Sequence, residues 1–193
     1  DIEFKFPFGF KELEGIHSRT DFDLSAHEKF SGRKLQYFDP ERNENYVPYV
    51  VETSIGLDRM FLALFSNCLK DEVLEDGSER TVLSLPPALA PVKAAILPLV
   101  KKDGLPEFAE KIFNDLKYDF NVISEEKDSI GKRYRRQDAI GTPFCITVDH
   151  DSLADGTVTL RERDTMKQER VKVEDLRRII DEKVNFRTLL SKI

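Results

Sequence analysis

The sequence predicts an α/β protein with two units, the second being a three-layer domain built on a mixed sheet. From residue 92 onward, strand-like apolar runs alternate with amphipathic helical segments, a pattern typical of a sheet covered by helices. An acidic segment with a Gly-Ser turn, residues 70–80, follows an earlier strand-turn-helix pattern and marks a domain boundary. The 193 residues are enough for two small cores. We therefore expect units at residues 1–78 and 79–193.

The first unit is predicted to begin with a strand that buries one aromatic face. Its alternating phenylalanines are Phe4, Phe6, Phe8 and Phe10. Such a strand needs partners, so we expect sequence upstream of residue 1. Residues 31–46 are polar and rich in turn residues, which predicts a loop. Residues 46–54 favour a strand that passes through Gly56 into a buried helix at residues 57–69.

The second unit is predicted to contain five strands and three helices. The strands are expected at residues 92–100, 121–124, 144–148, 157–163 and 168–173. The helices are expected at residues 105–118, 129–139 and 174–190. The second helix is basic, and the last one closes the domain with a charged outer face.

Composition restricts the class of protein. Hydrophobic residues make up 40% and charged residues 34%, which is too apolar for a disordered chain and too charged for a membrane protein. We expect a soluble, cytoplasmic protein without a membrane partner. A net charge of −6 disfavours non-specific coating of nucleic acid but permits a local basic patch. Cys68 and Cys145 lack CxxC spacing and predict buried free thiols, and the three histidines have no zinc-ligand spacing.

Two groups of residues in the first unit are candidates for chemistry. Glu52 and Ser54 share one strand face before Gly56 and are expected to line one pocket. Residues 56–59 place backbone N–H groups and Arg59 at a helix N-terminus, where phosphate is attracted, although such a string also makes ordinary surface ion pairs. Glu12 and Glu14 continue the face of the phenylalanines and are candidates for binding an ammonium or a metal-bound phosphate. The alternative places both glutamates in a solvated loop.

Basic residues gather in the predicted helix of the second unit. Lys132, Arg133, Arg135 and Arg136 surround Tyr134, and Arg161 and Arg163 share one face of a strand. Arginines on phosphates and an aromatic ring under a base are how single-stranded RNA loops are held. The alternative is a solvated helix face compensated by Glu125, Glu126 and Asp128. From the residues alone, the two interpretations are evenly balanced.

Blocks along nearly the whole chain resemble glycyl-tRNA synthetases. In the first unit they are residues 10–16, residues 19–24 with His27, and residues 49–59, the last of which is similar to class II motif 3. In the second unit, residues 85–91, 131–134, 138–143 and 157–164 resemble the class IIa anticodon-binding domain. The second set is shared with threonyl-, prolyl- and histidyl-tRNA synthetases, whereas the first set points to glycine.

The resemblance implies a fold and a set of roles. The fold is the C-terminal part of a class II antiparallel-sheet catalytic domain, followed by a three-layer α/β anticodon-binding domain. The implied ATP-binding residues are Glu12, Leu13, Gly56, Leu57, Asp58 and Arg59, with Glu12 also implied as a Mg²⁺ ligand. The implied glycine-binding residues are Glu52, Thr53, Ser54, Ile55 and Gly56. The residues implied to bind the tRNA anticodon are Arg133, Tyr134, Arg135, Arg136, Arg161 and Arg163.

The implied reaction is ATP-dependent ligation of glycine to tRNA(Gly) through glycyl-adenylate, with ATP and Mg²⁺ required and a homodimer as the full-length enzyme. Catalysis is assigned to Arg59, on the outer phosphates, and to Glu52, on the glycine ammonium. Asp21, Asp23 and His27 are expected only to brace the pocket. Motifs 1 and 2 are not found, so this chain alone is expected not to activate glycine. The alternatives are a non-catalytic RNA-binding accessory module and a synthetase for threonine, proline or serine.

Overall fold

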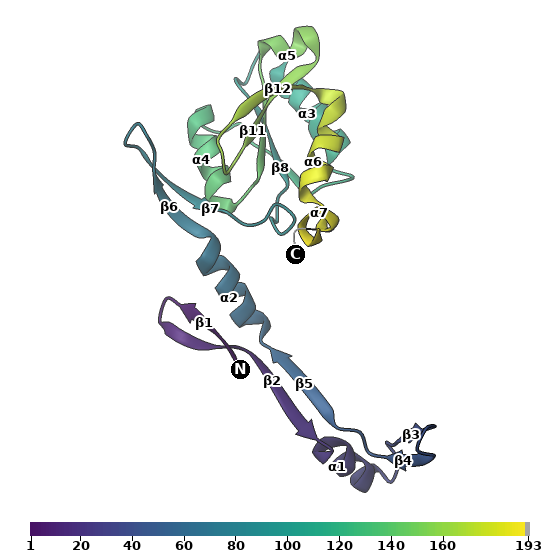
Figure 1. The fold of residues 1–193 in the computed structure, drawn as a ribbon. Coiled ribbons are helices and arrows are strands. Elements are labelled where there is room, and N and C mark those ends of the chain that lie inside the picture. Colours follow the sequence, from purple (N-terminus) through teal and green to yellow (C-terminus); the bar gives the residue numbers. More distant parts are fainter. Residues whose placement is uncertain (192–193) are drawn as a thin grey trace. The chain divides into compact units, whose positions relative to one another are not determined.

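The structure, a computed structural model, describes residues 1–191 and confirms the mixed α/β class. The chain divides into two compact units, Asp1–Ser66 and Asn67–Ile193. Figure 1 labels the elements of both units. The sequence placed the division after residue 78, and that boundary stays a prediction.

The sheet of the first unit has three antiparallel strands. Their order is β1 (Ile2–Phe6), β2 (Gly9–Thr20) and β5 (Val50–Ile55). The prediction of one strand through the four phenylalanines was wrong, because the chain turns back at Pro7 and Phe8, and Gly9 adopts a φ of 106° that favours glycine. Only Phe6 is buried, whereas Phe8 and Phe10 are more than half exposed.

The rest of the first unit contains two helices and a small hairpin. The helices are α1 (Phe22–Ser31), which the sequence analysis missed, and α2 (Leu57–Cys68), which it predicted. The expectation that this second helix is buried was wrong, because most of its side chains are exposed, Leu57 and Phe61 among them. The hairpin, β3 (Tyr37–Asp39) with β4 (Glu44–Tyr46), lies where only a loop was expected. The Asp39 carboxylate accepts from the backbone N–H groups of Glu41 and Arg42 and so stabilises the turn between the two strands.

A hairpin occupies the acidic segment that was expected to be a boundary. Its strands are β6 (Leu69–Val73) and β7 (Glu79–Leu83). The Asp76 carboxylate accepts from the N–H and hydroxyl of Ser78, and these bonds lower the Asp76 pKa. Arg80 and Val82 alternate on the buried face of β7, which packs against α4 (Ile130–Ile140).

The second unit is built on a five-stranded mixed sheet. The strand order is β12 (Gln168–Lys172), β11 (Thr157–Glu162), β10 (Phe144–Val148), β8 (Ala94–Pro98) and β9 (Val122–Ser124). Strand β8 is parallel to both of its neighbours, and the other two pairs are antiparallel. Four of the strands lie within one residue of their predicted bounds, and β8 is two residues shorter than predicted at each end.

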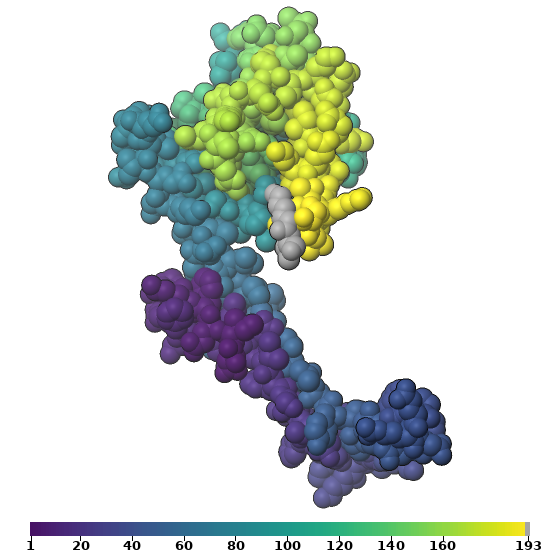
Figure 2. Space-filling model, viewed as in Figure 1, coloured from purple at the N-terminus to yellow at the C-terminus, as the bar shows by residue number. Residues whose placement is uncertain are grey.

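Helices cover both faces of this sheet, as Figure 1 shows. Ala94 and Ile96 pack with α3 (Leu105–Leu116) and α6 (Leu176–Val184), whereas Ala95 and Leu97 pack towards α4. Since strand side chains alternate, the fully apolar β8 contributes to both cores. The outer side of α6, in yellow, forms part of the visible surface of the second unit (Figure 2).

The C-terminal region differs from the single helix that was predicted. It consists of a short 3-10 helix (Val173–Asp175), α6 and α7 (Phe186–Leu190). The break occurs because Asn185 is extended and its side chain accepts from the N–H of Thr188, starting a new helix. Helix α5 (His150–Asp155) was also missed, although Asp149 and Ser152 form a capping box that is visible in the sequence.

We expect Gly141→Ala to destabilise the second unit more than Gly156→Ala. Both glycines end a helix with positive φ, which costs alanine about 1–2 kcal/mol. At Gly141 the added methyl also meets the Leu83 carbonyl oxygen at 3.0 Å, whereas nothing lies within 4 Å at Gly156. The clash adds roughly 1–3 kcal/mol. Equal free energies of unfolding for the two variants in urea would contradict this packing.

Candidate functional site

A pocket in the first unit lies where β5 turns into α2. Because Glu14 is opposite Ile55 in the β2–β5 pair, Glu12 and Leu13 come to lie beside this turn. The pocket has a volume of about 540 Å³. It is lined by Glu12, Leu13, Ser54, Gly56, Leu57, Asp58 and Arg59. All six residues that the sequence assigned to ATP line this pocket. They come from two segments, residues 12–13 and 56–59, which are 43 positions apart along the chain at their nearest ends.

Arg59 connects the two segments of this pocket. Its Nη1 donates to the backbone oxygen of Glu12 at 2.6 Å, which holds the guanidinium at the pocket wall. The Glu12 carboxylate stays exposed, and so does most of the turn at Gly56. The site thus offers one guanidinium and the first N–H groups of α2 to an anion, and a carboxylate to a cation.

Glu52, the predicted partner of the glycine ammonium, lies on the same strand face as Ser54 but is not among the residues that line the pocket. Its carboxylate is 3.6 Å from Nε of Arg19. Arg19 is held more closely by Asp23, with N···O distances of 2.8 and 2.9 Å. These bonds lower the pKa of Asp23 and raise that of Arg19. Asp23 therefore holds the cation beside Glu52, while a bracing role for Asp21, Asp23 and His27 in the pocket stays a prediction.

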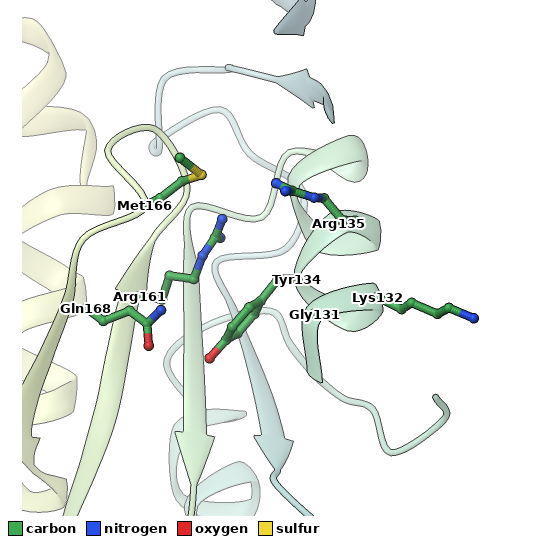
Figure 3. Close-up of a pocket in the computed structure, with 7 residues that line it drawn as sticks. All are labelled: Gly131, Lys132, Tyr134, Arg135, Arg161, Met166 and Gln168. Atoms are coloured by element: carbon green, nitrogen blue, oxygen red, sulfur yellow. The ribbon is translucent and has the colours of Figure 1, made fainter. Parts of the chain in front are cut away.

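A second pocket, of about 340 Å³, opens between α4 and the β11–β12 hairpin (Figure 3). It is lined by Gly131, Lys132, Tyr134, Arg135, Arg161, Met166 and Gln168. The Arg161 guanidinium lies 4.8 Å from the centre of the Tyr134 ring, a cation–π contact. The Tyr134 hydroxyl contacts the Thr147 hydroxyl at 2.6 Å, and burial raises the pKa of Tyr134. The wall of this pocket is therefore aromatic and cationic.

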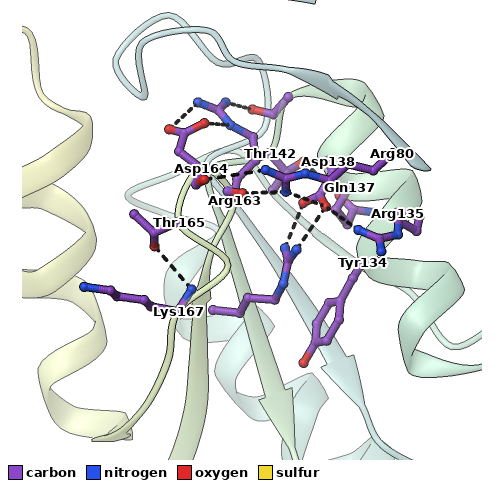
Figure 4. Close-up of polar contacts among 12 residues, drawn as sticks. Arg80, Tyr134, Arg135, Gln137, Asp138, Thr142, Arg163, Asp164, Thr165 and Lys167 are labelled. Carbon is purple, nitrogen blue, oxygen red and sulfur yellow. Dashed lines mark hydrogen bonds and ion pairs between the residues drawn. The ribbon is translucent and has the colours of Figure 1, made fainter. Parts of the chain in front are cut away.

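A buried carboxylate organises the cations behind this wall. Asp138 is fully buried and accepts from Arg161 Nη1 at 2.8 Å and from Arg161 Nη2 at 3.0 Å. Arg80 Nη1 donates to the same carboxylate at 3.2 Å, while Arg135 stays 3.9 Å away. Figure 4 shows Asp138 between Arg80 and Arg135. Two arginines from two strands thus share hydrogen bonds to one carboxylate, and a third arginine lies nearby on α4.

Comparisons with known proteins agree with this arrangement. The family described as an anticodon binding domain matches residues 93–183. Glycine–tRNA ligase of Chlorobaculum tepidum is 58% identical over 89% of this chain, and that of Clostridium perfringens is 55% identical over 96%. The chain belongs to the glycine–tRNA ligase family. It spans 36% of the first relative's length and 40% of the second's.

Within this glycine–tRNA ligase family member, the six residues predicted to contact the anticodon fall into two groups. Tyr134, Arg135 and Arg161 line the second pocket. Arg133 and Arg163 do not line it, and each is 2% exposed; Arg161 lines the pocket but is itself only 3% exposed. Arg133 donates to the carbonyl oxygens of residues 98, 99 and 125, and Arg163 to those of residues 85 and 141.

The sixth residue, Arg136, is held by acidic neighbours. It pairs with Glu125 at 2.6 Å and with Asp128 at 2.9 Å, and this contact lowers the pKa of Asp128. For Arg136, the structure therefore agrees with the alternative interpretation, in which acidic residues compensate a basic helix face. Sequence reasoning missed Met166 and Gln168, because only the register of the β11–β12 hairpin brings them opposite α4.

Two kinds of feature are absent from the part of the chain that the structure describes. Within residues 1–191, no group of three or more histidine, cysteine, aspartate or glutamate side chains is arranged to hold a metal ion. In the same range, none of the helices has the length and apolar character needed to cross a membrane.

We expect Asp138→Ala to lower the free energy of unfolding by about 3–5 kcal/mol, because it leaves two buried arginines without their carboxylate. Asp164→Ala is the matched control. Asp164 is half exposed, and its partner Arg163 keeps two carbonyl acceptors, so a loss of about 1 kcal/mol or less is expected. Chemical denaturation followed by circular dichroism measures both. Similar losses would show that Asp138 does not organise the unit.

Proposed function

We propose that this chain is part of an enzyme that ligates glycine to tRNA(Gly) at the expense of ATP, through glycyl-adenylate. The observation that carries the proposal is identity of 54–58% to three glycine–tRNA ligases over about nine-tenths or more of the chain. The two pockets support it, because the pocket at the β5–α2 turn suits a nucleoside triphosphate and the pocket beside α4 suits RNA. They would supply activation of glycine and recognition of the tRNA, respectively.

The first pocket suits ATP by charge and size. Arg59 faces the phosphates and stabilises the charge that develops on the pyrophosphate leaving group. The backbone of residues 56–58 approaches the nucleotide closely because Gly56 has no side chain. The exposed Glu12 carboxylate lines this pocket and would hold the Mg²⁺ that accompanies ATP, which would screen the phosphate charge.

Glycine is assigned to the adjoining face of β5. Glu52 binds the ammonium group, and the Arg19–Asp23 pair beside it keeps the carboxylate oriented without neutralising it, since Arg19 lies closer to Asp23 than to Glu52. Ser54 lies between Glu52 and the nucleotide pocket and limits the space for a larger side chain. Selectivity then combines capture of the charge with steric exclusion.

The second pocket is assigned to the anticodon loop. The proposal keeps Tyr134, Arg135 and Arg161 from the sequence prediction and adds Lys132, which points outward from α4 in Figure 3. The Tyr134 ring, with Arg161 behind it, suits an unstacked base, and the partly exposed Arg135 guanidinium suits its phosphate. Arg133 and Arg163 support the walls from behind through their carbonyl acceptors.

In the full-length enzyme, we expect Glu52→Gln to raise the KM for glycine about 10- to 100-fold in pyrophosphate exchange, with little change in the KM for ATP. The reason is loss of a charge-assisted contact to the ammonium, worth about 1.5–3 kcal/mol. Glu44→Gln, on the exposed strand β4, is the control and should leave both constants unchanged. An unaltered KM for glycine would remove Glu52 from this role.

We also expect this chain to bind an RNA hairpin that carries the glycine anticodon loop, with affinity that falls as salt rises. Lys132→Ala and Arg135→Ala should each flatten the slope of log K against log salt by about 0.7, the value for one contact to single-stranded RNA. Lys111→Ala, in α3 on the opposite face of the sheet, is the control. Equal binding of a hairpin with a scrambled loop would argue against anticodon recognition.

A further inference from the structure

Arg80, in the β6–β7 hairpin, contacts Asp138 behind the wall of the second pocket. Its guanidinium is almost completely buried, and Nη1 donates to Asp138 Oδ2 at 3.2 Å and to the carbonyl oxygen of Arg163 at 2.8 Å. On its other side, Nε donates to Glu72 at 2.7 Å. Arg80 is not among the residues that line the pocket. Any effect it has on a ligand there must pass through another side chain.

The Asp138 carboxylate is the point through which such an effect passes. Its Oδ1 accepts from Arg161, and its Oδ2 accepts from both Arg161 and Arg80. Arg135 stands three residues before Asp138 on α4, the spacing at which a helical ion pair normally forms. Its Nη1 is nevertheless 3.9 Å from Oδ2, beyond hydrogen-bond distance. Arg80 therefore occupies the acceptor that Arg135 would otherwise use.

The charges around this carboxylate do not balance. Among the side chains paired with Asp138 or with Arg80, the arginines Arg80, Arg135 and Arg161 carry three positive charges, and Asp138 and Glu72 carry two negative charges. Asp76, in the exposed turn of the β6–β7 hairpin, forms no ion pair with Arg135, but its pKa is lowered by hydrogen bonds within the turn and further by the charge of Arg135. The two buried arginines take the closer contacts, and the surplus charge is left on Arg135. Arg135 is 39% exposed and lines the pocket. Its position suits a contact with a ligand phosphate.

We propose that Arg80 is a positioning residue for the second pocket: by occupying Asp138 it keeps the Arg135 guanidinium free to bind an RNA phosphate. The RNA part of this statement rests on the proposed function. When the charge at residue 80 is removed, Arg135 turns to Asp138, and the pocket loses one cation. The hairpin thus controls a phosphate contact without touching the RNA.

The first test is a double-mutant cycle on binding of the anticodon-loop hairpin by the full chain. Arg80→Met, which keeps length and removes charge, should flatten the salt slope by about 0.7, as Arg135→Ala does. The double variant should show no further change, because both substitutions remove the same contact. Arg80→Lys restores the charge and should restore the slope. Additive effects, or an unchanged slope for Arg80→Met, would overturn the proposal.

Glu72→Gln is the matched control. It removes the charge of the other carboxylate that pairs with Arg80 and leaves the contact with Asp138 in place, so the salt slope should stay that of the unmodified chain. A flattened slope for Glu72→Gln equal to that of Arg80→Met would mean that the hairpin acts through general loosening. That result would overturn the proposal that Arg80 acts by occupying the Asp138 carboxylate.

The second test needs no RNA. With arginine labelled with ¹⁵N, rotation about the Nε–Cζ bond of Arg135 should be fast in the unmodified chain and slowed in Arg80→Met, where Asp138 holds the guanidinium. An unchanged Arg135 signal would refute the proposal even if RNA binding were lost. A changed signal in a chain that fails to bind RNA would refute the proposed function alone. If circular dichroism shows that Arg80→Met is unfolded, Arg80→Gln, which keeps a donor for the Arg163 carbonyl, should give the same change.

Discussion

The second unit depends on a carboxylate that water does not reach. Asp138, on α4, holds Arg161 from β11 and Arg80 from β7, so one side chain connects segments that are 58 and 23 residues away. Two buried guanidinium groups without this partner would be costly, and the partner alone would be equally so. The Tyr134 ring in turn lies against Arg161. The position of the Tyr134 ring in the pocket wall therefore depends on the ion cluster behind it.

The first unit is held in a different way, by backbone pairing. Pairing of β2 with β5 brings Glu12 beside the start of α2, and Arg59 closes the arrangement through a main-chain oxygen. Most of the pocket side chains stay exposed and free to contact a ligand. Glu52, which lies outside this pocket on the same strand face as Ser54, differs from them because a cation already lies 3.6 Å from its carboxylate. The geometry of the pocket at the β5–α2 turn is thus set by strand register, whereas the surroundings of Glu52 are set by charge.

The parts of the fold that sequence predicted well are those whose signal lies within one segment. Residues 105–116 have helical periodicity and residues 144–148 are a continuous apolar run, and both were placed correctly. Alternation alone was misleading at residues 4–10, because a turn at Pro7 and Phe8 preserves the spacing of the phenylalanines while reversing the chain. The same limit applies to the basic residues. Spacing could not distinguish Arg135, which is exposed, from Arg133, whose guanidinium binds carbonyl oxygens at the end of β8.

The β6–β7 hairpin has a practical consequence for anyone who divides or extends this chain. Its turn is stabilised by its own side chains, through Asp76 and Ser78, so an inserted peptide tag between residues 74 and 78 would disturb only local bonds. A fragment of the second unit that begins after residue 80 would lack Arg80, and Asp138 would lose this hydrogen-bond partner. An expression fragment of the second unit should therefore start before Leu69, even though the amino-acid composition of residues 70–80 resembles that of a linker.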